Sequence, residues 1–102
     1  MIPAILLLLA EKPTHGYELI EKYMTLGFTD ANSDPGAIYR TLNTLETKGF
    51  IKSVWETDKP GAAKKIYSIT GDGLELLKIW VIEIKERKKV LELFVKRYES
   101  LD

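Results

Sequence analysis

The sequence predicts a mainly α-helical domain that carries one small β-hairpin and ends in a long helix. Apolar residues recur at three- and four-residue spacing over most of the chain, which is typical of amphipathic helices. Between about residues 51 and 70, two short strand-like runs flank a Pro-Gly turn signal, as in a hairpin. After residue 73 no proline or glycine interrupts the chain, so one helix is expected to run to about residue 99.

The composition is typical of a globular protein with a single hydrophobic core. The chain has 102 residues, of which 45% are hydrophobic and 29% are charged, and it contains no cysteine, which excludes disulfides and thiolate metal sites. The longest apolar run, at residues 5–10, is far shorter than the ~20 residues of a membrane-spanning helix. It lacks the flanks of a secretory signal. We therefore expect a cytoplasmic protein with no membrane association, no metal and no cofactor.

Two short helices are expected before a polar loop at residues 28–34. The first begins near Pro3 and ends before Pro13, and its leucine-rich run should be buried on most sides. Thr14 is expected to cap the second helix, which should end at Gly27. The inner face of this second helix is expected to hold Tyr17, Ile20 and Met24, with Leu19 and Tyr23 as further candidates.

A third helix, beginning at Pro35, has the clearest boundaries. Asp34 suits the N-cap position, and Gly49 suits the position just beyond the end. Its buried stripe is expected to consist of Ile38, Leu42 and Leu45. Its opposite face is expected to expose Gly36, Tyr39, Arg40, Asn43 and Thr47. A short helix that is buried on its back and polar on its front suits the DNA major groove, although an ordinary solvated helix has the same pattern.

The formal net charge is +0, but its distribution is uneven. Residues 34–65 carry six lysine or arginine residues and four acidic ones, whereas residues 1–33 carry two and four. The basic excess therefore lies in the segment that holds the third helix and the hairpin. An excess this small is compatible with DNA binding but is not by itself evidence for it.

The hairpin is expected to pair residues 51–57 with residues 65–70, and Thr70 is expected to cap the last helix. At ~1.5 Å per residue this helix would be about 40 Å long, too long for so small a domain to cover. Its heptad-like apolar series is Leu77, Trp80, Ile84, Leu91, Phe94, Tyr98 and Leu101. A helix that is apolar on two faces needs two partners, so a homodimer is expected; the alternative is a helix that packs only on its own domain.

The order of helix, helix, helix, hairpin and long helix is the winged helix-turn-helix plan. Three stretches sharpen it: residues 15–18 (HGYE), residues 35–39 (PGAIY) and residues 65–70 (KIYSIT), the last followed by Gly73. Together they closely resemble the PadR family of transcriptional regulators, and the resemblance covers nearly the whole chain. Two departures are Ala37, where the family often has threonine, and residues 61–63 (GAA), where the hairpin of the family usually carries more arginine.

The resemblance implies a dimeric DNA-binding regulator, most simply a repressor, with a DNA-binding domain at residues 1–70 and a dimerisation helix at residues 71–102. The residues expected to contact double-stranded DNA are Tyr17, Gly36, Tyr39, Arg40, Asn43, Lys59, Lys64 and Lys65. The residues expected at the subunit and ligand interface are Leu77, Trp80, Ile84, Leu91, Phe94 and Tyr98. Some family members bind a small aromatic or phenolic effector, and such a ligand is a further expectation here.

Three side chains have more than one interpretation. His15 is expected to form local hydrogen bonds at the start of the second helix, with a pH sensor as the alternative and no support for a metal site. Trp80 can either line an aromatic pocket between subunits or simply belong to the dimer core. Trp55 is expected to pack against the domain, although it can also border such a pocket.

Two other classes of function differ in how well they fit the sequence. A winged-helix module that binds proteins and has lost DNA binding is the alternative favoured by the zero net charge, by Ala37 and by the sparse hairpin tip. An enzyme is not expected, because the sequence shows no nucleophile–base pair, no Walker-type phosphate loop and no cluster of metal ligands.

Overall fold

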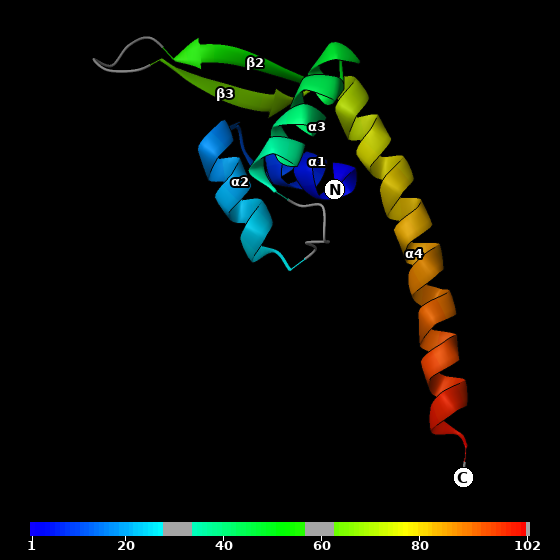
Figure 1. Ribbon diagram of the computed structural model, residues 1–102. Coiled ribbons are helices and arrows are strands. Elements are labelled where there is room, and N and C mark those ends of the chain that lie inside the picture. The colour runs from blue at the N-terminus through cyan, green and yellow to red at the C-terminus, as the bar shows by residue number, and fades with distance from the viewer. Residues whose placement is uncertain (28–33, 57–62, 102) are drawn as a thin grey trace.

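The computed structural model of the protein describes residues 1–27, 34–56 and 63–101 (Figure 1). The elements are α1 (Ile2–Glu11), β1 (Thr14–His15), α2 (Gly16–Thr25), α3 (Pro35–Thr47), β2 (Ile51–Glu56), β3 (Lys64–Ile69) and α4 (Gly71–Glu99). The predicted fold class is confirmed: the described residues form four helices and one small antiparallel sheet, and the last helix is long. In Figure 1 the far half of α4 extends well beyond the rest of the domain.

The sheet has three strands rather than the expected two. Its order is β1-β3-β2, and the short β1 pairs antiparallel with β3, Thr14 opposite Tyr67 and His15 opposite Ile66. Thr14 does not cap α2 as predicted; its hydroxyl donates a 2.9 Å hydrogen bond to the Lys12 carbonyl, and the N-cap residue is His15. The prediction failed because two extended residues carry too little pattern to be recognised as a strand.

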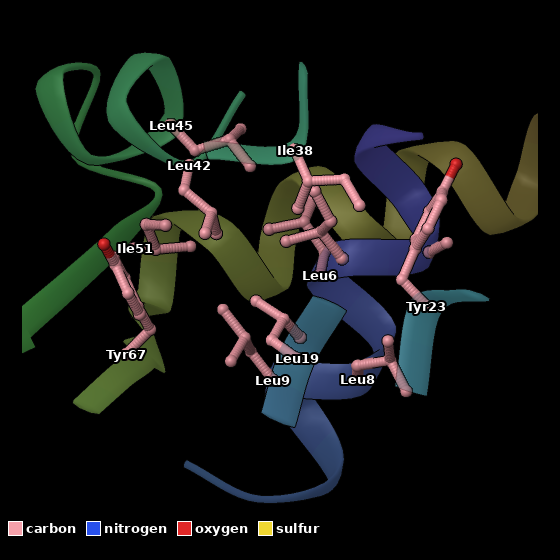
Figure 2. Packing of buried hydrophobic residues seen from close by; sticks show 12 residues of the cluster. Leu6, Leu8, Leu9, Leu19, Tyr23, Ile38, Leu42, Leu45, Ile51 and Tyr67 are labelled. Atoms are coloured by element: carbon pink, nitrogen blue, oxygen red, sulfur yellow. The ribbon is translucent and has the colours of Figure 1, made fainter. Parts of the chain in front are cut away.

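The core lies around α1, which packs against α2, β3 and α4 (Figure 2). The apolar residues buried in it come from α1, α2, α3 and the sheet: Ala4, Ile5, Leu6, Leu8, Leu9, Leu19, Tyr23, Ile38, Leu42, Leu45, Ile51 and Tyr67. The expected burial of the α1 leucine run is confirmed except at Leu7, which is exposed. The core therefore holds α2, α3 and the sheet in one unit.

The inner face of α2 differs from the one predicted. Leu19 and Tyr23 are buried and Ile20 is half-buried, but Tyr17 and Met24 are exposed. The buried positions follow Gly16 at three- and four-residue spacing, about 100° around the helix from the stripe of Tyr17 and Met24. Both stripes are apolar in sequence, and the packing of α1 selects between them.

The predicted ends and faces of α3 are confirmed. The Asp34 carboxylate accepts a 2.7 Å hydrogen bond from the Ala37 amide, as an N-cap should. Gly49 has φ +82°, the left-handed conformation that glycine adopts without strain at a helix end. The buried stripe is Ile38, Leu42 and Leu45. Because this back face is packed in the core, the orientation of the front face is set by the whole domain.

The start of α4 is attached tightly to the turn between α3 and β2. The Thr70 hydroxyl accepts a hydrogen bond from the Gly73 amide, confirming the predicted cap, and donates a 2.7 Å hydrogen bond to the Gly49 carbonyl. A Cβ on Gly73 would lie 2.1 Å from the Phe50 carbonyl oxygen, so only glycine fits this approach. From residue 81 to residue 101 every residue is exposed in the single chain.

Candidate nucleic-acid interface

The front face of α3 is exposed, as predicted. Gly36, Tyr39, Arg40, Asn43 and Thr47 are all exposed, while the stripe behind them is buried. A Cβ on Gly36 would lie 3.3 Å from Nη1 of Arg40, so the guanidinium runs back along the first turn of the helix. Among the described residues Arg40 forms no ion pair, which leaves its guanidinium available to an external acceptor.

Beside this face is a hollow of about 270 Å³ between the start of α2, the side of α3 and the sheet. It is lined by Gly16, Tyr17, Tyr39, Trp55, Ala63, Lys64, Lys65 and Tyr67. Four of these side chains are aromatic and two are cationic. Four of the eight DNA contacts predicted from the sequence line this hollow, because folding brings α2, α3 and β3 together here: Tyr17, Tyr39, Lys64 and Lys65.

Tyr67 forms the floor of the hollow and is only 3% exposed. Burial raises the pKa of its phenol, and the nearby Glu46 charge adds to that effect. Its hydroxyl donates no hydrogen bond to any residue that the structure describes. Gly16 makes this packing possible, since a Cβ there would lie 3.3 Å from the Tyr39 ring and 3.4 Å from the Tyr67 ring.

The two lysines of the hollow differ in availability. The Lys65 ammonium lies 3.9 Å from the Glu46 carboxylate and 5.4 Å from the centre of the Trp55 ring, so part of its charge is already balanced within the protein. The Lys64 ammonium lies 5.3 Å from the centre of the Tyr17 ring and pairs with no carboxylate in the described part of the chain. Lys64 is therefore the more available cation.

Two sequence-based expectations for the hairpin, for Lys59 and for Trp55, have different outcomes. Lys59 lies outside the described residues, so the structure does not test its predicted DNA contact. Trp55 was expected to pack against the domain, but 60% of its surface is exposed. It lies on the same face of β2 as the buried Ile51, but near the far end of the strand, where its ring meets Lys65 and borders the hollow.

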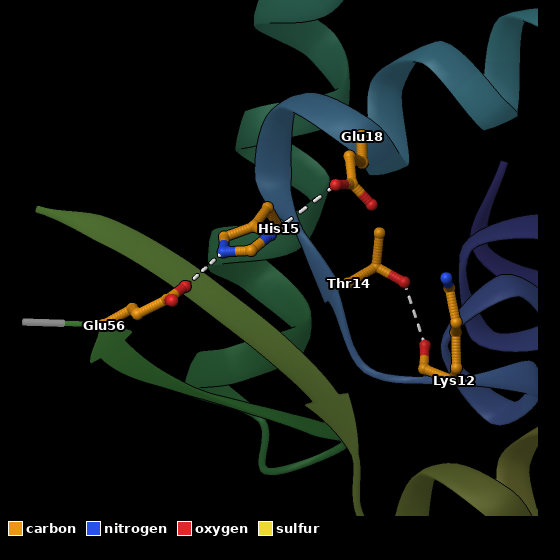
Figure 3. Close-up of polar contacts among 5 residues, drawn as sticks. All are labelled: Lys12, Thr14, His15, Glu18 and Glu56. Atoms are coloured by element: carbon orange, nitrogen blue, oxygen red, sulfur yellow. Dashed lines mark hydrogen bonds and ion pairs between the residues drawn. The ribbon is translucent and has the colours of Figure 1, made fainter. Parts of the chain in front are cut away.

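His15 reaches further than the local role predicted for it (Figure 3). Its Nε2 lies 2.6 Å from the Glu56 carboxylate, at the far end of β2 and 41 residues along the chain, and its Nδ1 lies 3.8 Å from Glu18. Its ring stacks on Tyr17 with the ring centres 5.4 Å apart. No sequence signal pointed to this contact, because it depends on β1 joining the sheet.

The predicted interface residues on α4 divide into two groups. Leu77 packs partly against the core of its own chain, and Trp80 is half-buried beside an open groove of about 550 Å³. That groove is lined by Met1, Ile2, Pro3, Ala37, Arg40, Thr41, Thr44 and Trp80. The second group, further along the helix, is exposed in the single chain and consists of Ile84, Leu91, Phe94 and Tyr98.

The described residues contain neither a group of three or more histidine, aspartate or glutamate side chains placed to hold a metal ion nor a helix long and apolar enough to cross a membrane. The polar α3 face and its neighbouring hollow are thus the chemically distinctive surface of the described chain.

Comparison with known proteins identifies families and solved structures that share this architecture. The model of the "Transcriptional regulator PadR-like family" matches residues 5–79. A solved protein of unknown function, described as a potential transcription factor, is 36% identical over 97% of this chain and 87% of its own, with a TM-score of 0.85. A PadR family regulator from Clostridium difficile is 27% identical over 92% of this chain and 96% of its own, with a TM-score of 0.80.

Two further relatives complete the comparison. Bacillus subtilis PadR, solved in complex with operator DNA, is 31% identical over 79% of this chain and 45% of its own, with a TM-score of 0.70. An uncharacterised protein of Lysinibacillus sphaericus is 28% identical over 93% of this chain and 87% of its own. The match of the family model over most of the chain, together with the shared winged-helix fold, shows that the chain belongs to the PadR-like family of transcriptional regulators.

Proposed function

We propose that this protein is a sequence-specific DNA-binding repressor that acts as a homodimer. The observation that carries the proposal is the front of α3, where Tyr39, Arg40 and Asn43 are exposed on a helix whose back is buried. This helix would enter the major groove, as the reading helix of a helix-turn-helix protein does. The solved complex of Bacillus subtilis PadR with operator DNA supports the same partner for this chain.

The roles of the polar residues follow from their chemistry. The Arg40 guanidinium can donate two hydrogen bonds to the O6 and N7 atoms of a guanine, and Asn43 can read an adenine. Gly36 lets the first turn of α3 approach the DNA backbone closely. Tyr17, Tyr39, Lys64 and Lys65 surround the hollow and would contact phosphates, with Lys59 as a further candidate; such contacts raise affinity without reading sequence.

The homodimer is proposed from the exposed apolar side chains of α4. Phe94 and Tyr98 are 72% and 69% exposed, and Ile84 and Leu91 lie at heptad-related positions before them. Rings this large are seldom left in water along a helix 29 residues long. A second α4 would bury them, and would present two copies of α3 to major grooves about one helical turn apart.

A small aromatic or phenolic effector is proposed to release the DNA. The groove beside Trp80 is one place for it, because the same groove is lined by Arg40 of the reading helix. A ligand there would weaken DNA binding only if it prefers the conformation that does not bind DNA. Since the chain has two tryptophans, a Trp55→Phe variant isolates the fluorescence of Trp80, and quenching by planar aromatic carboxylates or cations would reveal binding.

The experiment that tests the main proposal is selection from a random duplex DNA pool, followed by a salt titration on the selected site. A two-fold symmetric motif whose affinity falls steeply with salt is expected. Arg40→Ala should weaken binding by about 1–3 kcal/mol and relax the preference at one base pair. Asn43→Ala is a matched change on the same exposed face of α3, and it should relax the preference at a different base pair.

The alternative is a winged-helix module that binds another protein and not DNA. Folded protein that enriches no motif and binds duplexes weakly and without sequence preference would favour that alternative over the repressor.

A further inference from the structure

We propose that Glu46 lowers the affinity of this protein for DNA by holding the Lys65 ammonium and balancing its charge. The proposal rests on the DNA-binding function proposed above, in which Lys65 is one of the phosphate contacts. Glu46 is a positioning residue, because its carboxylate acts through Lys65 and is not expected to touch DNA. The contacts that carry the proposal lie where α3 packs against β2 (Figure 1).

Glu46 lies on the side of α3 that is proposed to face DNA. It follows Tyr39 by seven residues and Asn43 by three, so the three side chains share one stripe of the helix. Tyr39 and Asn43 are exposed, whereas Glu46 is half-buried. A carboxylate on this stripe repels the DNA backbone, so the cation that balances it affects the affinity for DNA.

The two oxygens of the Glu46 carboxylate have partners on two different strands. The Ser53 hydroxyl of β2 donates a 2.5 Å hydrogen bond to Oε2, and Nζ of Lys65 on β3 lies 3.9 Å from Oε1. The hydrogen bond from Ser53 fixes one oxygen and so keeps the other directed towards Lys65. The carboxylate is therefore oriented by the sheet and not only by its own helix.

Lys65 is held by aromatic rings as well as by Glu46. It lies directly opposite Trp55 in the sheet, and its ammonium is 5.4 Å from the centre of the Trp55 ring and 5.9 Å from the centre of the Tyr67 ring. Cation–π contacts and the ion pair together retain the ammonium at the wall of the hollow. A DNA phosphate must compete with these partners to bind it.

The ion pair makes that competition costly without preventing it. The Lys65 side chain is 33% exposed and the Glu46 side chain 31%, and a partly exposed pair of this kind is weak. A phosphate that takes the ammonium leaves the carboxylate unbalanced beside it, so the pair adds little net charge to the contact. A lysine that neutralises a phosphate without such a neighbour contributes about 0.9 to the slope of log K against log salt.

The test measures the binding of Glu46→Gln to the duplex selected by the wild type. Glutamine removes the charge, and its amide oxygen can still accept the hydrogen bond from Ser53. The slope of log K against log salt should become steeper by about 0.9 per subunit, so that a dimer loses about tenfold more affinity than the wild type between 50 and 200 mM salt. At 50 mM salt the variant should bind at least about tenfold more tightly than the wild type. Glu46→Ala also gives up the hydrogen bond from Ser53, yet it should show the same steeper slope, because the slope depends on charge.

Glu92→Gln is the matched control for the change in net charge. The Glu92 carboxylate lies 3.9 Å from the Lys88 ammonium, the same distance as in the Glu46 pair, on the part of α4 that extends beyond the domain (Figure 1). This variant should keep the affinity and the salt slope of the wild type. If Glu92→Gln gains as much affinity as Glu46→Gln, the gain comes from net charge alone and the proposal is wrong.

Duplexes in which single phosphates are replaced by neutral methylphosphonates show whether the gain is local. Glu46→Gln should be weakened by replacement of one phosphate per half-site to which the wild type is insensitive. Adding Lys65→Met to Glu46→Gln should remove that sensitivity and the gain in affinity. If Glu46→Gln binds more tightly with no new sensitive phosphate, the carboxylate does not act through Lys65 and the proposal is refuted.

The two proposals fail in different ways. If the wild type selects no DNA site, the proposed DNA-binding function is refuted, and the role of Glu46 in it is refuted as well. If the wild type binds a selected site and Glu46→Gln binds it with equal or lower affinity, Glu46 only joins α3 to the sheet, and its proposed role alone is refuted. Thermal unfolding of each variant confirms that the protein compared is folded.

Discussion

Replacing Gly73 with alanine should detach the start of α4 from the rest of the domain. The Cβ that alanine adds would lie 2.1 Å from the carbonyl oxygen of Phe50 and 2.6 Å from Cγ1 of Ile69. The first distance is far below the 3.4 Å at which ordinary contacts to a Cβ begin, and its partner is a backbone atom that cannot rotate away. The helix or the α3–β2 turn must therefore move.

The cost has three parts. Forcing an extra methyl group into a packed site costs about 1–3 kcal/mol. The movement also strains two hydrogen bonds, from the Thr70 amide to the Phe50 carbonyl at 3.1 Å and from the Thr70 hydroxyl to the Gly49 carbonyl at 2.7 Å, each worth about 1 kcal/mol. Alanine gains up to about 1 kcal/mol over glycine from helix propensity. The free energy of unfolding should fall by about 2–4 kcal/mol.

Gly71→Ala is the matched control for this change. It adds the same methyl group two residues earlier in the same turn, but a Cβ there would meet nothing within 4 Å. Thermal unfolding, followed by circular dichroism at one fixed protein concentration, should show a melting temperature lower by about 10 °C or more for Gly73→Ala and unchanged or slightly higher for Gly71→Ala. Equal melting temperatures for the two variants would refute the packing argument.

Two further predictions concern the α4 interface and the buried phenol. Phe94→Glu should convert the proposed homodimer to a monomer in analytical ultracentrifugation, because a charge would replace a ring that is 72% exposed in the single chain and would be buried in the dimer. Lys89→Glu, on the same helix, should remain dimeric. A dimeric Phe94→Glu protein would contradict the interface. Since burial raises the pKa of Tyr67, its neutral form is the one the fold favours. Its contribution to stability is therefore present below pH 10 and is lost as the pH rises through the raised pKa. In alkaline urea unfolding Tyr67→Phe should lose less stability above pH 10 than the wild type, and parallel curves for the two proteins would exclude the effect.

The elements predicted correctly are those whose signals lie within a few residues of each other. The cap at Asp34, the glycine at Gly49 and the buried stripe between them define α3 without reference to the rest of the chain. The same is true of Thr70 at the start of α4. Caps and helical periodicity act over one to three turns, so they can be recognised in a sequence.

The predictions that failed concern relations between distant segments. In the sequence, the stripe of α2 that contains Tyr17 and the stripe that contains Tyr23 are equally plausible as the buried face. The packing of α1 buries the stripe that contains Tyr23. Trp55 is a large apolar residue on a strand, yet it is 60% exposed, although Ile51 on the same face of β2 is buried. His15 was expected to act locally, and its main partner proved to be Glu56.

The sequence by itself determined the helical class of the protein, the boundaries of α3, the polar front of that helix and the family to which the chain belongs. Tertiary structure alone decided that β1 joins the sheet, that Gly73 meets the Phe50 carbonyl, and that His15 and Glu56 bond across β3. The physical reason is the range of the interactions. Hydrogen bonding and capping along one helix are encoded by neighbours in the chain, whereas these contacts exist only after packing has brought distant segments together.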